Sequence, residues 1–205
     1  MSHYADPRVA QARSGTYLLL ASLVLGELDA EAAEMLSDMP VFGEAMAASG
    51  GPGAVQALRA EYTRTFLMNL HPYESVFVDD SGLLNTPSSG AVLRHYRERA
   101  FESRALPQVG APDHLGLELE FMAYLVEREA DARRAGDAGE AGSFRADQLH
   151  FLEAHLVKWA PLFGRALTEL ADTPLYRTLG QAIETFVLGD YQALSESEAA
   201  SGDGG

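Results

Sequence analysis

The sequence predicts an all-α fold, a single-domain helical bundle, and three observations support this prediction. Apolar residues recur at the three- and four-residue spacing of an amphipathic helix in one segment after another. Segments that alternate between apolar and polar residues, as half-buried strands do, are missing from the sequence. The length of 205 residues suits one domain with a substantial core. We expect this domain to span residues 1–194.

The first predicted helix is apolar around most of its circumference, which is typical of a buried helix. It contains the stretch YLLLASLVLG at residues 17–26, which could also be the apolar part of a secretory leader. Asp6 in the preceding region and the lack of a small-x-small cleavage site favour the core helix. Asp29 can cap the second helix, and Pro52 suits the first turn of the fourth. The helices of this half are expected at residues 16–28, 30–37, 39–48 and 52–67.

Residues 69–87 interrupt the helical pattern, because two prolines, a glycine and two consecutive aspartates fall within them. A loop of this length in a compact domain usually serves a function or is mobile. Asp113 is expected to cap the longest helix, which should lie at the centre of the bundle. The helices of this half are expected at residues 88–103, 114–134, 143–159, 161–171 and 174–188. An internal hinge is predicted around residues 136–142, and residues 195–205 are expected to form a disordered acidic tail.

The composition argues against several classes of partner and site. A formal charge of -15 and a pI near 4.7 argue against nucleic acid, whose phosphates are neutralised by Lys and Arg. Cysteine is absent, which excludes disulfides, zinc–thiolate sites and cysteine-held iron–sulfur clusters. No apolar run approaches the ~20 residues that cross a bilayer, so no stable membrane insertion is expected. We therefore predict a cytoplasmic protein.

The sequence supplies no residues that we would assign as catalytic, cofactor-binding or metal-binding, and we do not predict an enzyme. Asp147 and His150 approximate one Glu-x-x-His pair, but a dinuclear site in a helical bundle requires two such pairs and two further carboxylates. His150 and His155 are five positions apart and point to different faces of a helix. The Gly-x-Ser-x-Gly motif of hydrolases and the Gly-rich dinucleotide fingerprint are both missing. A helical metalloprotein is the less favoured alternative.

Two segments are better candidates for a binding site. The first, PYESVF at residues 72–77, lies in the long loop. The second, PDHLGLELEFM at residues 112–122, opens the central helix, where Asp113 can cap free amides and His114 can pair with Glu118 one turn later. A cap and a paired histidine need no function beyond structure. The same acid and imidazole groups at a helix mouth could equally receive a basic peptide.

Together these segments make the sequence resemble a known family, the redox-enzyme maturation chaperones named after TorD and DmsD, with NarJ as a more distant relative. The resemblance runs from about residue 17 to residue 188. It rests on the order and spacing of several motifs, each of which is weak by itself. These are RAEYTRTFL with Tyr62 and Phe66, then PYESVF, then PDHLGLELEFM, then His150, Phe151, Leu152, His155 and Trp159 before Pro161.

The resemblance implies that the chain binds the Tat signal peptide and the body of a molybdopterin-containing catalytic subunit of the DMSO reductase class. Such chaperones hold the apo-enzyme in the cytoplasm and assist cofactor insertion before export or assembly, and the chaperone itself needs no cofactor. A monomer and a domain-swapped homodimer are both compatible with the sequence. A generic α-helical scaffold or ligand-binding domain is the alternative function.

The resemblance also implies site residues. The Asp-His pair of the family corresponds to Asp113 and His114, and its Tyr/Glu-Ser loop corresponds to residues 73–75. Many members have Glu-Pro just upstream, where this chain has Gly110 and Ala111, so a leader contact through that glutamate is missing here.

A Tat leader presents two adjacent arginines and then a moderately apolar stretch, so its recognition requires an apolar groove and carboxylates. We expect aromatic side chains to wall the groove while Glu74, Asp113 and Glu118 face the two arginines. The predicted peptide-binding residues are Tyr62, Phe66, Pro72, Tyr73, Glu74, Ser75, Phe77, Asp113, His114 and Glu118.

Overall fold

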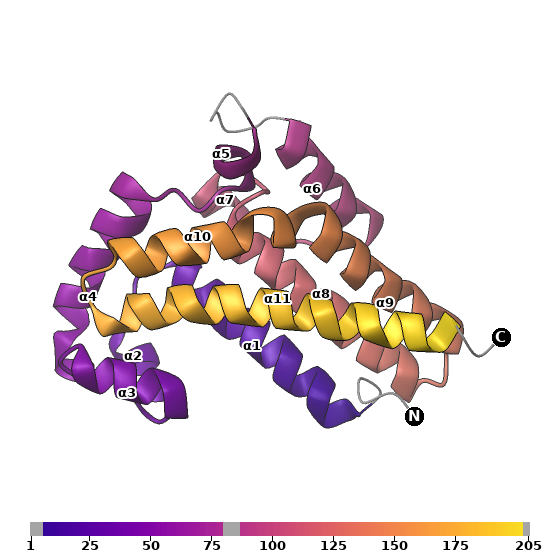
Figure 1. The fold of residues 1–205 in the computed structure, drawn as a ribbon, viewed down its shortest axis with the longest axis horizontal. Helices are drawn as coiled ribbons and strands as arrows, with labels where there is room; N and C mark the ends of the chain where they lie inside the picture. Colours follow the sequence, from indigo (N-terminus) through magenta and orange to yellow (C-terminus); the bar gives the residue numbers. More distant parts are fainter. Residues whose placement is uncertain (1–5, 80–86, 203–205) are drawn as a thin grey trace.

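The computed structural model describes residues 6–79 and 87–202, and the side chains of these residues as far as 199. The predicted all-α class is confirmed (Figure 1). Within the described residues no strand occurs, and Tyr73 and His114 form a single isolated antiparallel bridge. The helical elements are α1 (Pro7–Leu25), α2 (Ala30–Ser37), α3 (Pro40–Ala48), η2 (Pro52–Ala54), α4 (Val55–Tyr62), η3 (Thr63–Asn69), α5 (Glu74–Val78), α6 (Pro87–Glu98), α7 (Leu106–Val109), α8 (Leu115–Arg134), α9 (Ala138–Phe151), η4 (Leu152–Leu156), α10 (Val157–Leu170) and α11 (Pro174–Gly202).

Helix α8 lies at the centre of the core, as predicted. It packs along α1 on one side and along α9 on the other, while α10 and α11 pack side by side (Figure 1). Most of its apolar residues are fully buried, because neighbouring helices cover it on several faces. The largest side chains of the surrounding core are Trp159, Tyr17, Tyr176, Phe66, Phe121, Phe151 and Phe163.

Several predicted boundaries are wrong. Helix α1 begins at Pro7, where the Asp6 carboxylate accepts a hydrogen bond from the Arg8 amide, so Ser14 and Gly15 lie inside the helix and do not precede it. Helix α10 runs through Pro161 without ending. It follows directly on η4, a π-helical segment, and proline was expected to separate two helices there because it lacks an amide donor.

The C-terminal half also differs from the prediction. The longest helix is α11 and not α8, and it continues past Ser195 to Gly202, into the segment that the sequence predicts to be disordered. Residues 203–205 lie outside the described part of the chain. Helices α8 and α9 are joined by only residues 135–137, where Gly136 takes a positive φ of 77°. The predicted flexible connection is therefore short, and the hinge itself stays a prediction.

Two glycines allow α10 and α11 to approach closely. A Cβ atom on Gly164 would lie 2.5 Å from the carbonyl oxygen of Gly180, and a Cβ atom on Gly180 would lie 2.4 Å from the carbonyl oxygen of Gly164. Both distances are far below van der Waals contact, and the obstructing atoms belong to the backbone, which cannot turn aside as a side chain can. The two helices therefore pack together through these glycines.

We expect Gly180→Ala to lower the free energy of unfolding by about 1–3 kcal/mol, because α10 and α11 must separate to admit the methyl group. Chemical denaturation of the two proteins measures this loss. Gly15→Ala is the matched control, because a Cβ on Gly15 meets nothing within 4 Å and alanine favours the helix. Equal stability of Gly180→Ala and Gly15→Ala would contradict the close approach.

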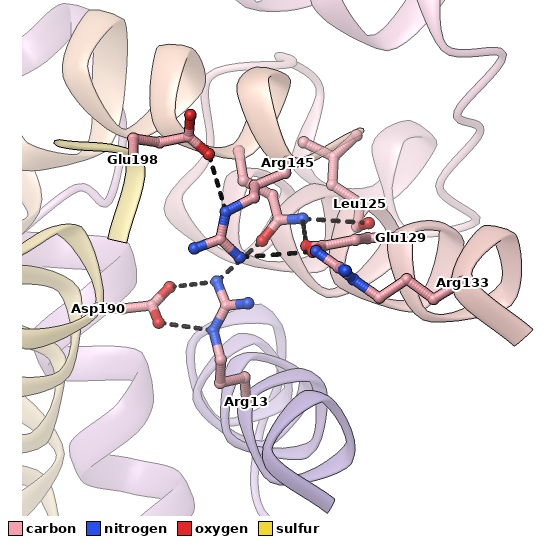
Figure 2. Close-up of polar contacts among 8 residues, drawn as sticks. Arg13, Leu125, Glu129, Arg133, Arg145, Asp190 and Glu198 are labelled. Atoms are coloured by element: carbon pink, nitrogen blue, oxygen red, sulfur yellow. Dashed lines mark hydrogen bonds and ion pairs between the residues drawn. The ribbon is translucent and has the colours of Figure 1, made fainter. Parts of the chain in front are cut away.

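A buried polar network joins the two ends of the described chain (Figure 2). The Arg13 guanidinium of α1 donates to both carboxylate oxygens of Asp190 in α11, at 2.6 and 2.9 Å, and the Tyr17 hydroxyl donates to the same carboxylate at 2.7 Å. Arg13 also donates to the Gln148 amide oxygen at 2.8 Å, and Gln148 donates to Glu129 of α8 at 2.7 Å. Each charged group in the network is thus compensated, which burial requires.

Candidate functional site

The N-terminus of α8 is capped by His114 and not by Asp113 as predicted. The Nδ1 atom of His114 accepts a hydrogen bond of 3.1 Å from the amide of Gly116. An atom that accepts in this way carries no proton, so the proton of the neutral ring is on Nε2. The predicted pairing of His114 with Glu118 does not form within the described structure.

Asp113 instead holds α5 against the start of α8. Its Oδ2 atom accepts a hydrogen bond of 3.0 Å from the Ser75 amide, and its carbonyl oxygen accepts one of 2.9 Å from the Glu74 amide. The Leu115 amide donates to the carbonyl oxygen of Pro72 at 2.8 Å. These bonds surround the isolated bridge between residues 73 and 114. The two motifs singled out in the sequence, PYESVF and PDHLGLELEFM, are thereby joined into one unit.

Two further elements complete the interior side of this unit. The Glu74 carboxylate of α5 lies 2.8 Å from Nδ1 of His155, which belongs to the π-helical segment η4. The Trp159 indole in α10 donates a hydrogen bond of 3.2 Å to Oε2 of Glu118. Because Asp113, Glu74 and Glu118 are almost completely buried, they form an internal acid cluster, the name used below for these three carboxyl groups.

Burial sets the protonation of the groups around the acid cluster. Burial raises the pKa of Glu118 well above its usual value. The nearby Glu74 and Asp113 carboxyl groups act in the same direction, and the Trp159 hydrogen bond opposes them. Burial lowers the pKa of His114 to about 4, against the opposing effect of Asp113. Burial therefore favours the protonated form of Glu118, and at neutral pH His114 is a neutral imidazole.

The acid cluster is also short of hydrogen bonds. Within residues 6–79 and 87–199, buried atoms that lack a hydrogen-bond partner include Asp113 Oδ1, Glu118 Oε1, Ser75 Oγ and His155 Nε2. A buried polar atom without a partner costs free energy. Several such atoms close together therefore make the acid cluster a candidate binding site.

The aromatic candidates lie mostly in the core. Tyr62 and Phe66 are buried, the Tyr62 hydroxyl donates to the carbonyl oxygen of Val24 at 2.9 Å, and the Phe66 ring packs against Phe163. Phe77 of α5 is half-buried against the Trp159 ring, with 5.5 Å between the centroids. The acidic candidates and most of the aromatic ones therefore point inward, and the groove that the sequence predicts for a leader stays a prediction.

A small pocket of about 180 Å³ nevertheless opens at the surface beside this unit. Half of the predicted residues line it, while the acid cluster, Ser75 and Phe77 do not. Two large apolar side chains next to it are exposed, Leu67 by 59% and Met68 by 69%, and both belong to the π-helical segment η3. The lining residues are Leu25, Tyr62, Phe66, Leu67, His71, Pro72, Tyr73, Gln108, Val109 and His114.

Sequence reasoning missed Leu67 and Met68 as binding candidates. Their position in RAEYTRTFLMN reads as the end of a helix with apolar residues facing inward. Both side chains belong to η3 and point into solvent, while the neighbouring Phe66 of the same segment stays buried. Exposed apolar side chains that are clustered mark interaction sites more often than single ones do.

A metal centre and a membrane span both lack support in the described residues. No group of three or more His, Cys, Asp or Glu side chains there has the arrangement of a metal site. No helix in the same part of the chain is long and apolar enough to cross a bilayer.

Comparison with known proteins places the chain in a family. The family described as "Nitrate reductase delta subunit" matches residues 26–165, which include every predicted site residue. The chain belongs to the nitrate reductase delta subunit family. This membership confirms the resemblance to the TorD and NarJ chaperones that the motifs predict.

Relatives of the chain carry chaperone names. It is 41% identical over 75 residues to the selenate reductase assembly chaperone protein of Thauera selenatis, covering 36% of this chain and 38% of that protein. The chlorate reductase assembly chaperone protein of Ideonella dechloratans is 41% identical over 76 residues, with the same coverage. The chaperone protein TorD of Aliivibrio fischeri is 24% identical over 208 residues, covering 89% of this chain and 94% of that protein. The match to the first two proteins thus spans less than half of their length.

Proposed function

We propose that this chain is a non-enzymatic assembly chaperone, which binds the N-terminal leader and the body of a molybdenum-containing reductase in the cytoplasm while its cofactor is inserted. Membership of the nitrate reductase delta subunit family supports the proposal, as do the names of relatives that assemble selenate and chlorate reductases. The observation that carries it is the pocket beside Leu67 and Met68, which opens onto the joined PYESVF and PDHLGLELEFM motifs.

The apolar part of the leader would lie over η3. Leu67 and Met68 offer exposed apolar surface there, and Tyr73 and Pro72 line the pocket beneath them. A leader is disordered by itself, so its ordering cost must be offset by buried apolar area and by charged hydrogen bonds. The flexible thioether of methionine suits a surface that accepts leaders of different sequence.

The two arginines of the leader would be directed to the acid cluster. His114 lines the pocket. Asp113 directly precedes His114 in the chain, and Glu118 follows His114 by one helical turn. Because these carboxyl groups are buried, α5 must shift for a guanidinium to reach them, and a charge-assisted hydrogen bond formed there contributes roughly 1.5–3 kcal/mol. An exposed ion pair contributes well under about 1 kcal/mol, so the acid cluster outweighs the net charge of -15 in recognition.

The double substitution Leu67→Ser with Met68→Ser tests this proposal. We expect it to weaken binding of a synthetic twin-arginine leader peptide by roughly tenfold or more, because apolar area that the leader would cover is lost. Isothermal titration calorimetry measures the dissociation constants. Both side chains are exposed, so the fold should be unaffected, whereas substitution of the buried Asp113 and His114 would disturb α5 and α8 as well.

Val41→Ser is the matched control, because Val41 is 65% exposed but lies on α3, away from the pocket. Its affinity for the same peptide should equal that of the unsubstituted protein. If the Leu67 and Met68 double variant bound the peptide as tightly as the unsubstituted protein, the leader site would lie elsewhere. If the unsubstituted protein bound no leader peptide at all, a generic scaffold would be favoured.

A further inference from the structure

Glu118 is the least compensated carboxyl group of the acid cluster. It is fully buried, it receives only the Trp159 hydrogen bond, and its second oxygen lacks a partner within the described residues. Asp113, by contrast, accepts the Ser75 amide, and Glu74 faces the His155 imidazole. A carboxyl group in such surroundings stays neutral, because ionisation would bury an uncompensated charge.

The groups beside Glu118 come from several elements. They are Glu74 from α5, Asp113 from the turn before α8, Tyr96 from α6 and Trp159 from α10, and His155 from η4 contacts the neighbouring Glu74. None of these residues carries a fixed positive charge. A guanidinium brought into the cluster would therefore be the first fixed cation beside Glu118.

Three imidazoles lie next to the acid cluster. His95 of α6 is half-buried, with its ring centroid 5.3 Å from that of the buried His155 and 5.2 Å from that of the exposed His150. Burial lowers the pKa of His95, and the neighbouring His155 and His150 add to that effect. A test of proton exchange at Glu118 must therefore separate it from these histidines.

We propose that an arginine of the client leader binds the acid cluster in exchange for the proton of Glu118, so that leader affinity is linked to pH. The neutral carboxyl group gives its proton to the buffer, and the resulting carboxylate pairs with the guanidinium. This inference rests on the proposed function. A binding step that releases one proton strengthens about tenfold for each unit of pH, as long as the group is protonated in the free protein and ionised in the complex.

Calorimetry in buffers with different heats of ionisation measures the proton count. The probe is a synthetic peptide with two adjacent arginines followed by a leucine- and alanine-rich stretch, titrated at the same pH in phosphate and in Tris. We expect release of about one proton per peptide from the unsubstituted protein and of almost none from Glu118→Gln. Glutamine keeps an oxygen that accepts the Trp159 hydrogen bond but cannot ionise, and circular dichroism checks its fold.

Two controls locate the proton. A peptide with both arginines replaced by glutamine should bind more weakly and release no proton. The double variant His95→Gln with His150→Gln should release as many protons per bound peptide as the unsubstituted protein does. If the double variant released none, the assignment of the proton to Glu118 would be overturned. Binding without proton release by the unsubstituted protein would overturn this inference alone, whereas failure to bind any leader peptide would overturn the proposed function and the inference with it.

Discussion

Asp190→Ala is expected to lower the free energy of unfolding by about 3–5 kcal/mol, as removal of one partner from a buried ion pair commonly does. The Asp190 carboxylate accepts two hydrogen bonds from Arg13 and one from Tyr17, and all three side chains are buried. The substitution leaves the buried Arg13 guanidinium without this carboxylate. A loss of that size is a large fraction of the stability of an ordinary domain. Denaturation by urea, followed by circular dichroism, measures it.

The exposed ion pair between Arg165 and Glu184 provides the control. Arg165 is 62% exposed, and its Nε lies 2.7 Å from a carboxylate oxygen of Glu184, a distance similar to that in the buried pair. Because water screens the exposed pair, Arg165→Ala should change the free energy of unfolding by less than about 1 kcal/mol. If Asp190→Ala were no more destabilising than Arg165→Ala, the buried network would not hold α1 to α11.

Acid is expected to destabilise the protein through His114. Its pKa is about 4 in the folded protein and about 6.5 in an unfolded chain, so between these values the unfolded chain binds a proton that the folded chain does not. The free energy of unfolding therefore falls as the pH drops through this range, by about 3 kcal/mol in total for this group. Protonation would also remove the acceptor for the Gly116 amide and so the cap of α8. Urea denaturation at pH values from 7 to 4 measures the slope.

His114→Asn isolates this contribution, because asparagine can cap a helix but does not titrate. The variant should show a flatter dependence of stability on pH below about 6.5, whatever its stability at neutral pH. The raised pKa of Glu118 acts in the opposite direction, because it lowers the stability of the folded protein as the pH rises. This effect of Glu118 is the same in both proteins. Parallel pH profiles for the two proteins would show that His114 does not titrate as its burial requires.

The sequence predicted the helices well but not which neighbours the candidate site residues contact. Apolar spacing along α8 identified the central helix, because a buried helix repeats its apolar residues whatever its partners are. The same spacing could not tell which of two adjacent polar residues caps that helix, and the structure gives the cap to His114 and the contact with α5 to Asp113. A local sequence pattern predicts that a helix forms, but it does not predict which other helices that helix contacts.

Long-range contacts account for the other differences. The motifs containing Glu74 and Glu118 were identified, but their inward orientation depends on His155 and Trp159, which are far along the chain. The Arg13–Asp190 pair spans 177 positions and has no signature in either segment. The π-helical form of η3, the segment on which Leu67 and Met68 are exposed, also has no signature in the sequence.

The pairing of Arg13 with Asp190 has a consequence for the order in which the protein can fold. Helix α1 is synthesised well before α11, which supplies the carboxylate for its buried arginine. Before α11 is synthesised, burial of the Arg13 guanidinium would leave its charge without the Asp190 carboxylate, so the core between α1 and α11 should close only after α11 has emerged. Folding of this chain should accordingly depend on the formation of α11, in contrast to helical proteins whose contacts are mostly local.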